Sequence, residues 1–277
     1  MQLKASIKKE LLAFSRTSKL LIIALVFIGW SIFSPLMIRG VGLLMEALNP
    51  IYDEMGMDVS GMTDMLGSAS SLGVTSAVSE LGGVCLIVMI LLINSNAGGE
   101  QKKRSIIIPR SSGLRSFSYI FPKFIVYPPI AFVLAVAGAF SAWGISALIF
   151  DYNDVTLSGI LIGGILAGVS IMFYVCLHLT IGTATGKAGL SAALCIVASL
   201  LLPNIFAMTG ADYMYNPFTL SLIASSAVQP GMLSTTPPED IIVTALIALG
   251  LMVILYFIAL FAQNARRIDN SGNEIRL

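Results

Sequence analysis

The sequence predicts an all-α integral membrane protein with six transmembrane helices. Of its 277 residues, 56% are hydrophobic and only 11% are charged, and the mean hydropathy is +0.89. Soluble domains are about 45–50% apolar and about 25% charged, so a water-soluble fold would leave too much apolar surface exposed. Six runs reach the length of roughly 20 apolar residues that a helix needs to cross a bilayer. These runs are apolar on all sides, whereas strands of a membrane barrel alternate.

Each expected span is an apolar run bounded by polar residues. The runs are residues 20–38, 72–96, 124–150, 157–181, 190–208 and 241–262. The first is too long for the apolar region of a signal peptide and has no cleavage site after it, so we interpret it as a retained anchor. Two runs carry an ionisable group, Glu80 and His178. Glu80 is a candidate cavity-lining residue, with simple placement at the outer interface as the alternative, while a hydrogen-bonded packing role is favoured for His178.

Lysine and arginine predict the orientation, because they remain on the cytoplasmic side of a membrane. With six spans, 15 of the 16 basic residues fall on the side of the two termini, and only Arg39 falls on the other side. The long opposite loops, residues 39–71 and 209–240, are acidic instead. We therefore expect a multi-pass protein of the cell membrane with both termini, including the tail 263–277, in the cytoplasm. The basic residues serve orientation and lipid headgroups and do not indicate nucleic acid binding.

The first nineteen residues predict an amphipathic helix. Leu3, Ile7, Leu11 and Phe14 recur at helical spacing, and basic residues occupy the other faces. Such a helix beside a span is expected to lie in the inner membrane interface. The alternative is a frayed basic tail that serves orientation alone.

A second short apolar segment lies between spans five and six. Residues 217–228, PFTLSLIASSAV, are too short to cross the membrane and too apolar for a solvated loop. Pro217 suits the first turn of a helix. We expect a re-entrant external segment, with a surface helix as the alternative.

The loop between spans two and three concentrates charge in the stretch GGEQKKRSIIIPRSSG, residues 98–113. A short charged helix held between two span ends is suited to contact a soluble partner. A solvated loop that only sets orientation is the competing interpretation.

This arrangement resembles the ABC-2 family of ABC-transporter permeases, which pair with a separate ATPase. The family has a cytoplasmic coupling helix with a pattern like E-x-x-x-[KR]-[ST]…P…S…K. That pattern is matched here, in order, by Glu100, Arg104, Ser105, Pro109, Ser111 and Lys123. The resemblance implies six spans, an N-terminal interfacial helix, re-entrant external helices between spans five and six, and ATP-driven export or flipping. It also implies an ATPase-contact segment formed by Glu100, Lys103, Arg104, Ser105, Ile107, Pro109 and Arg110.

The sequence contains no P-loop motif that would let the chain bind and hydrolyse ATP. The nearest approach to a P-loop is GTATGKAG at 182–189, whose glycines are too close together and where Ala188 replaces the magnesium-binding hydroxyl. ATP and Mg²⁺ are therefore expected on a partner ATPase, beside a second copy of this chain or a sibling permease. An amphipathic or hydrophobic cargo, such as a peptide, lipid or drug, suits the apolar spans. A secondary transporter, an intramembrane enzyme and a scaffold of a signalling complex remain alternatives. One histidine and no H-E-x-x-H motif exclude most metal sites, and we expect no catalytic, metal or cofactor-binding residues in this chain.

Overall fold

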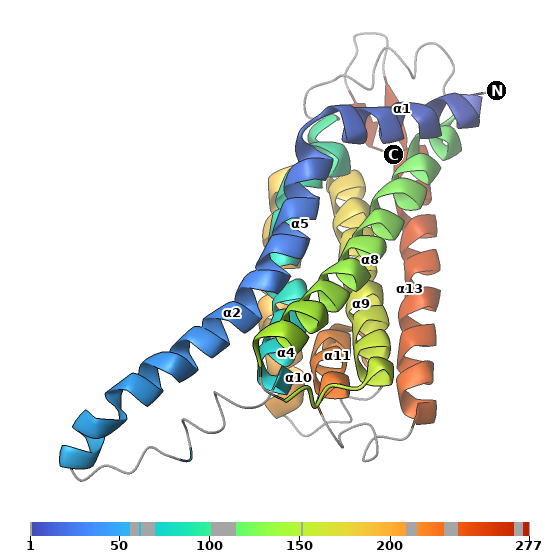
Figure 1. Cartoon of the computed structure of the whole chain (residues 1–277). Coiled ribbons are helices and arrows are strands. Elements are labelled where there is room, and N and C mark those ends of the chain that lie inside the picture. Colours follow the sequence, from blue (N-terminus) through green and yellow to red (C-terminus); the bar gives the residue numbers. More distant parts are fainter. Residues whose placement is uncertain are drawn as a thin grey trace.

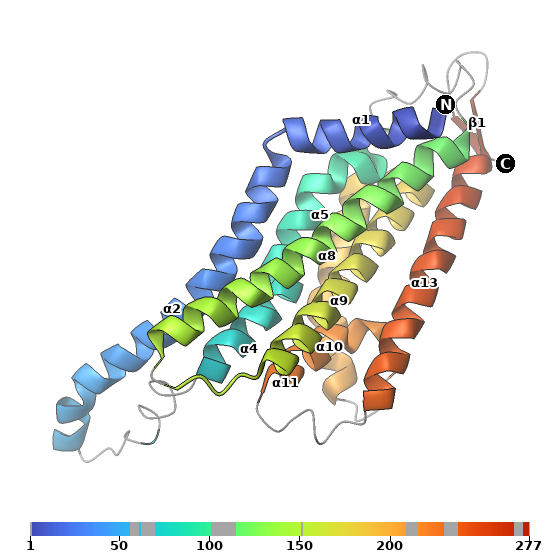
Figure 2. The same cartoon turned by 45° about the vertical axis from the view of Figure 1, so that its right-hand side comes forward.

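The computed structural model of the chain describes residues 2–55, 61, 70–100, 115–150, 152–208, 215–229, 238–268 and 274–276. Six of its helices are long and apolar enough to cross a membrane, which confirms that part of the prediction. The long helices run side by side as one bundle, and the short helix α1 lies across one end of it (Figure 1; Figure 2). Its helices are α1 Gln2–Arg16, α2 Lys19–Glu54, α4 Ser70–Glu80, α5 Leu86–Asn94, α8 Ser116–Ile149, α9 Leu157–Thr185, α10 Ala188–Met208, α11 Leu220–Val228 and α13 Pro238–Asn264.

Shorter elements complete these helices. The π-helical turns η1 (Leu81–Cys85) and η2 (Ser95–Gly99) continue α4 and α5, so residues Ser70–Gly98 form one span, called span two below. The 3-10 turn η3 (Pro217–Thr219) leads into α11. The expected all-α fold holds except in the tail, where β1 (Arg266–Ile268) pairs antiparallel with β2 (Glu274–Arg276).

The helix α9 is the centre of the bundle. The most apolar stretch of this span is 72% buried, against 50% or less in each of the other five candidate spans. Small residues on α9 let its neighbours approach closely, as is common between membrane helices. A Cβ atom on Gly163 would lie 2.9 Å from the carbonyl oxygen of Ala224 in α11, and one on Gly168 would lie 2.5 Å from the ring of Phe132 in α8.

Two helices extend by more than one turn and a half beyond the apolar runs that predicted them, α2 at its end and α8 at its start. The helix α2 continues through the expected loop as far as Glu54, because residues 43–48, LLMEAL, are all good helix formers. Beyond Gly42 none of its residues is buried, and this half extends away from the other helices (Figure 1; Figure 2). The helix α8 begins at Ser116 rather than Phe124. Helix formation does not stop where hydrophobicity stops, so apolar runs locate spans better than helix ends.

The segment 217–228 forms the expected short helix, with Pro217 in its first turn. It begins deep in the bundle, since a Cβ atom on Gly82 of span two would lie 2.9 Å from the Cβ atom of Ser221. It ends near the start of α9, where a Cβ atom on Gly159 would lie 3.1 Å from the carbonyl oxygen of Ala227. The helix α11 therefore packs inside the bundle rather than over its surface.

Polar side chains join neighbouring spans at several levels. Ser34 in α2 donates to Ser76 in α4 at 2.9 Å. His178 is buried in α9, where Nδ1 lies 2.8 Å from the hydroxyl of Ser191 in α10. A hydrogen-bonded packing histidine was the favoured interpretation, and this geometry agrees with it. The three cysteines, Cys85, Cys176 and Cys195, are buried.

Candidate functional site: a polar network where three helices meet

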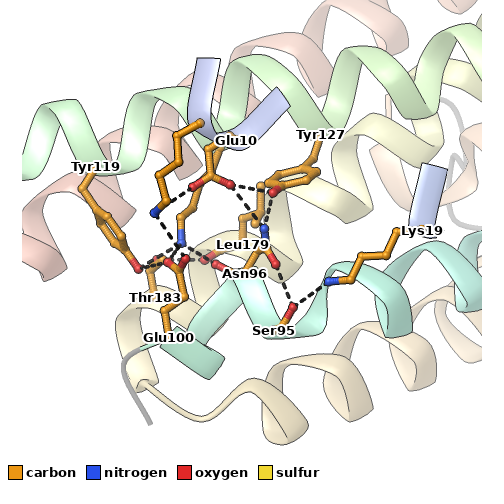
Figure 3. A network of polar contacts seen from close by, with 11 residues as sticks. Glu10, Lys19, Ser95, Asn96, Glu100, Tyr119, Tyr127, Leu179 and Thr183 are labelled. Carbon is orange, nitrogen blue, oxygen red and sulfur yellow. Dashed lines mark hydrogen bonds and ion pairs between the residues drawn. The ribbon is translucent and has the colours of Figure 1, made fainter. Parts of the chain in front are cut away.

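A network of charged and polar side chains joins α1, the last turn of span two and the first half of α8 (Figure 3). Among the described residues its charged members are Lys9, Glu10, Glu100 and Lys123, two cations and two anions. Asn96, Tyr119 and Tyr127 supply the neutral members. It lies at the end of the bundle that α1 crosses (Figure 2).

The α8 members of the network follow from helical spacing. Tyr119, Lys123 and Tyr127 are four residues apart, so they lie one above another on one face of α8. All three are buried, and Lys123 and Tyr127 are completely so. A buried ammonium group is costly unless it is paired and hydrogen-bonded. The local sequence therefore requires partners from other helices.

Lys123 uses all three of its donors. Its Nζ donates to Glu100 Oε2 at 2.6 Å, to the backbone oxygen of Asn96 at 2.7 Å and to the Tyr119 hydroxyl at 2.9 Å. Tyr119 in turn donates to Glu100 Oε2 at 2.7 Å. Glu100 and the backbone oxygen of Asn96 both lie where span two ends. Lys123 therefore binds the end of span two to α8.

Glu10 connects α1 to the same cluster. Only 4% of this residue is exposed. The Tyr127 hydroxyl donates to its Oε2 at 2.6 Å, and the side-chain amide of Asn96 donates to the same oxygen at 3.3 Å. Asn96 also donates to the Tyr127 hydroxyl. The ammonium group of Lys9 lies 3.9 Å from both Glu10 and Glu100, so it faces the two carboxylates together.

The electrostatics of Glu100 reflect these partners. Burial acts to raise the pKa of the carboxyl group, but the charge of Lys123, the hydrogen bonds from Lys123 and Tyr119 and the charge of Lys9 outweigh it. The pKa of Glu100 is therefore below its ordinary value, and the group is a carboxylate at neutral pH. About a quarter of its side chain is exposed.

The exit of span two also packs tightly against α9. A Cβ atom on Gly98 would lie 2.6 Å from the backbone oxygen of Gly182, and one on Gly182 would lie 2.1 Å from that of Ala97. A larger side chain at either position would push the two backbones apart. On the α2 side, Lys19 donates to Ser95 at 2.9 Å. Span two is thus held by four neighbouring helices where it ends.

Of the predicted contact segment, the structure describes only the first residue, Glu100. Glu100 lies in the network, and Lys123, the last residue of the coupling-helix pattern, is its ion-pair partner. The other predicted site residues lie outside the described part of the chain: Lys103, Arg104, Ser105, Ile107, Pro109 and Arg110.

Sequence reasoning missed Glu10 as a site residue. The predicted apolar stripe of α1 included Leu11, which is 49% exposed, whereas Glu10 takes the buried place beside Ile7 and Phe14. A signal was present, since residues 3, 7, 10 and 14 also fall on one helical face and Glu10 is the single acid among the basic residues of this helix. An acid on the apolar face of a basic helix indicates a buried partner.

The remaining candidates lie elsewhere. Glu80 is half-buried in the middle of span two. Within the described part of the chain, no group of three His, Cys, Asp or Glu residues is arranged to hold a metal ion. Comparison of the sequence with known protein families and with curated proteins finds no match.

Proposed function

We propose that the chain is the permease subunit of an ATP-driven exporter of the ABC-2 kind, with the polar network as the joint between a cytoplasmic contact segment and the spans. The observation that carries the proposal is the ion pair of Glu100 and Lys123 at 2.6 Å. These residues are the first and last of the coupling-helix pattern. Their contact holds the exit of the chain from span two beside its return in α8, which is what a segment that transmits force to both spans needs.

The network extends the same connection to α1. A displacement of the segment 101–114 acts on Glu100 and, through Lys123 and Asn96, on α8 and the end of span two. Tyr127 and Asn96 pass it to Glu10 of α1. In this proposal the partner ATPase binds residues of the segment itself, and ATP and Mg²⁺ bind to that ATPase. Two permeases, either two copies or this chain with a sibling, form one transporter.

The arrangement of the short helices supports the proposed topology. The helix α1 lies across the end of the bundle where α13 ends and β1 begins (Figure 2). This placement suits an interfacial helix and two termini on the cytoplasmic side of the cell membrane. The helix α11 begins beside Gly82 and ends beside Gly159, which suits a re-entrant segment from the opposite side.

A single-cysteine experiment tests this orientation. With the three buried native cysteines replaced, Tyr152→Cys should react with an impermeant maleimide in intact cells, because Tyr152 is exposed in the loop expected outside. Lys187→Cys, exposed at the other end of α9, should react only after the cells are opened. Labelling of the second variant in intact cells contradicts the orientation.

Recovery of an ATPase tests the function. The chain, tagged and extracted from its native membrane in mild detergent, should carry a vanadate-sensitive Mg²⁺-ATPase with it. Reversing two charges in the contact segment, Lys103→Glu with Arg104→Glu, should abolish that activity by removing a charged contact with the partner. The matched control is Lys187→Glu, an exposed lysine of another loop on the same expected side, which should leave it unchanged.

Two results contradict the proposal. One is an intact parent chain that brings no ATPase with it, and the other is a double variant that recovers as much activity as the parent. ATP-dependent uptake of an amphipathic cargo by inverted vesicles would then separate an exporter from a scaffold that merely binds an ATPase.

A further inference from the structure

Glu80 lies at membrane depth in span two. It is the eleventh residue of Ser70–Gly98, about 15 Å from the first residue and about 27 Å from the last at 1.5 Å per residue. The hydrocarbon core of a bilayer is about 30 Å thick. Wherever this helix is placed so that it crosses the whole core, Glu80 lies about 3 to 15 Å inside one face of the core.

A wide helical turn and a glycine lie next to the Glu80 carboxylate. The π-helical turn η1 begins directly after Glu80, and such wide turns are frequent at functional sites. A Cβ atom on Gly83 would lie 3.4 Å from Glu80 Oε2, so the glycine keeps this side open. Glu80 is half-buried and Leu91, farther along span two, is 55% exposed, while Leu81, the residue after Glu80, is completely buried.

Nothing in the described part of the chain neutralises this charge. No ion pair or hydrogen bond joins the Glu80 carboxylate to another described residue. A charged group at this depth is expensive and normally faces a partner or a water-filled cavity. The apolar runs of the spans supply no counter-charge, because residues 20–38, 72–96, 124–150, 157–181, 190–208 and 241–262 contain no lysine or arginine.

We propose that Glu80 binds the positive group of a lipophilic organic cation, which rests on the proposed function and assigns a class of cargo to it. The apolar body of the cation would lie against apolar side chains of the spans, while the carboxylate pairs with its charge. A metal ion is a poor fit, because calcium and magnesium need several oxygen ligands and the described residues offer no such group at this position.

Equilibrium binding of tritiated tetraphenylphosphonium to the purified chain tests this site. The chain is placed in phosphatidylcholine nanodiscs, which carry no net lipid charge, and the ATPase is left out. The parent chain should bind the cation saturably, and Glu80→Gln, which keeps the shape but removes the charge, should weaken binding at least about tenfold. Glu80→Asp should stay within a few fold of the parent. Neutral triphenylphosphine oxide should not compete.

The control is Glu46→Gln, which removes the same charge from the exposed half of α2 and should leave binding unchanged. Equal affinity in the parent and in Glu80→Gln overturns the proposal, as does the absence of saturable binding to the parent. If Glu80→Gln unfolds, Glu80→Met takes its place and should show the same loss of at least about tenfold. A folded methionine variant that binds the cation like the parent overturns the proposal. Because the binding assay contains no ATPase, the cation site can be refuted while the ATPase still copurifies. Likewise, the ATPase can fail to copurify while the cation still binds.

Discussion

Replacing Lys123 by methionine should destabilise the protein through the partners that it leaves behind. Methionine keeps the length and the apolar stem of lysine, so the main change is the loss of the ammonium group. The Glu100 carboxylate then loses its closest cation, 2.6 Å away, and the backbone oxygen of Asn96 loses its donor. Of the three acceptors, only the Tyr119 hydroxyl can reorient to another partner.

The magnitude follows from the burial of the pair. Removing one partner of a fully buried ion pair costs about 3–5 kcal/mol. Glu100 is about a quarter exposed, so water solvates part of the stranded charge, and we expect a loss of about 2–3 kcal/mol. For a chain of this size, where 1 kcal/mol shifts Tm by about 2–4 °C, Tm should fall by about 4–12 °C.

A double-mutant cycle isolates the pair from other effects of the substitution. Glu100→Gln alone should also lower Tm, but Lys123→Met combined with Glu100→Gln should lower it by less than the sum, with a coupling of about 1.5 kcal/mol or more. Melting of the detergent-solubilised variants at one fixed scan rate measures this. Lys187→Met makes the same change at an exposed lysine and should leave Tm within about 1 °C. Additive single effects, or a Lys123→Met shift as small as that of the control, would refute the reasoning.

The pair should also respond to pH in a defined direction. Folding lowers the pKa of Glu100, so the folded state binds fewer protons at this group than the unfolded state. Its stabilisation is complete above the ordinary carboxyl pKa of about 4.3 and is lost as the pH falls through the lowered value. The Tm difference between the parent and Glu100→Gln should therefore be constant from pH 8 to about pH 5 and should shrink only below about pH 4.

Two further substitutions test other contacts of the bundle. Gly182→Ala should lower the free energy of unfolding by about 1–3 kcal/mol through overpacking, because its Cβ atom would lie 2.1 Å from a backbone oxygen of span two. The control is Gly189→Ala, which has open space around it and should not lower Tm. Asp154→Asn should cost about 1 kcal/mol at neutral pH, since the Asp154 carboxylate accepts hydrogen bonds of 2.8 Å from Ser70 Oγ and from the backbone of Ser71. Burial alone would raise the pKa of Asp154, but these hydrogen bonds lower it, so this difference in Tm should also shrink in acid.

The sequence was informative about the spans because one physical property decides them. Long apolar runs have few stable alternatives to membrane helices, so all six runs correspond to helices in the structure. The extension of α2 to Glu54 escaped prediction because polar residues after Ile38 end a hydrophobic run without ending a helix. The tail hairpin, where Arg266 pairs with Arg276, left no pattern in so short a segment.

The candidate site was predictable only in part, because its partners are distant in sequence. The coupling-helix pattern contained Glu100 and Lys123 but gave no indication that they bind each other across 23 positions. Glu10 and Tyr127 are 117 positions apart, and only the position of Glu10 on the apolar face of α1 pointed to it. Helical periodicity indicates which side of a helix is buried, whereas the neighbour that it meets depends on how all the helices pack.

The network constrains how α1, span two and α8 can move in the proposed transporter. The carboxylate of Glu10 accepts hydrogen bonds from a tyrosine of α8 and a side-chain amide of span two. Lys123 binds the backbone oxygen of Asn96 and the carboxylate of Glu100, both at the end of span two. Separating these helices would expose several buried polar groups at once, and each unsatisfied group costs about 1–3 kcal/mol. A displacement of the segment 101–114 that supplies less free energy than this sum therefore moves the three helix ends together. The joint then transmits motion as a rigid unit, and the bending has to occur farther along the spans, where the wide turn η1 interrupts span two beside Glu80.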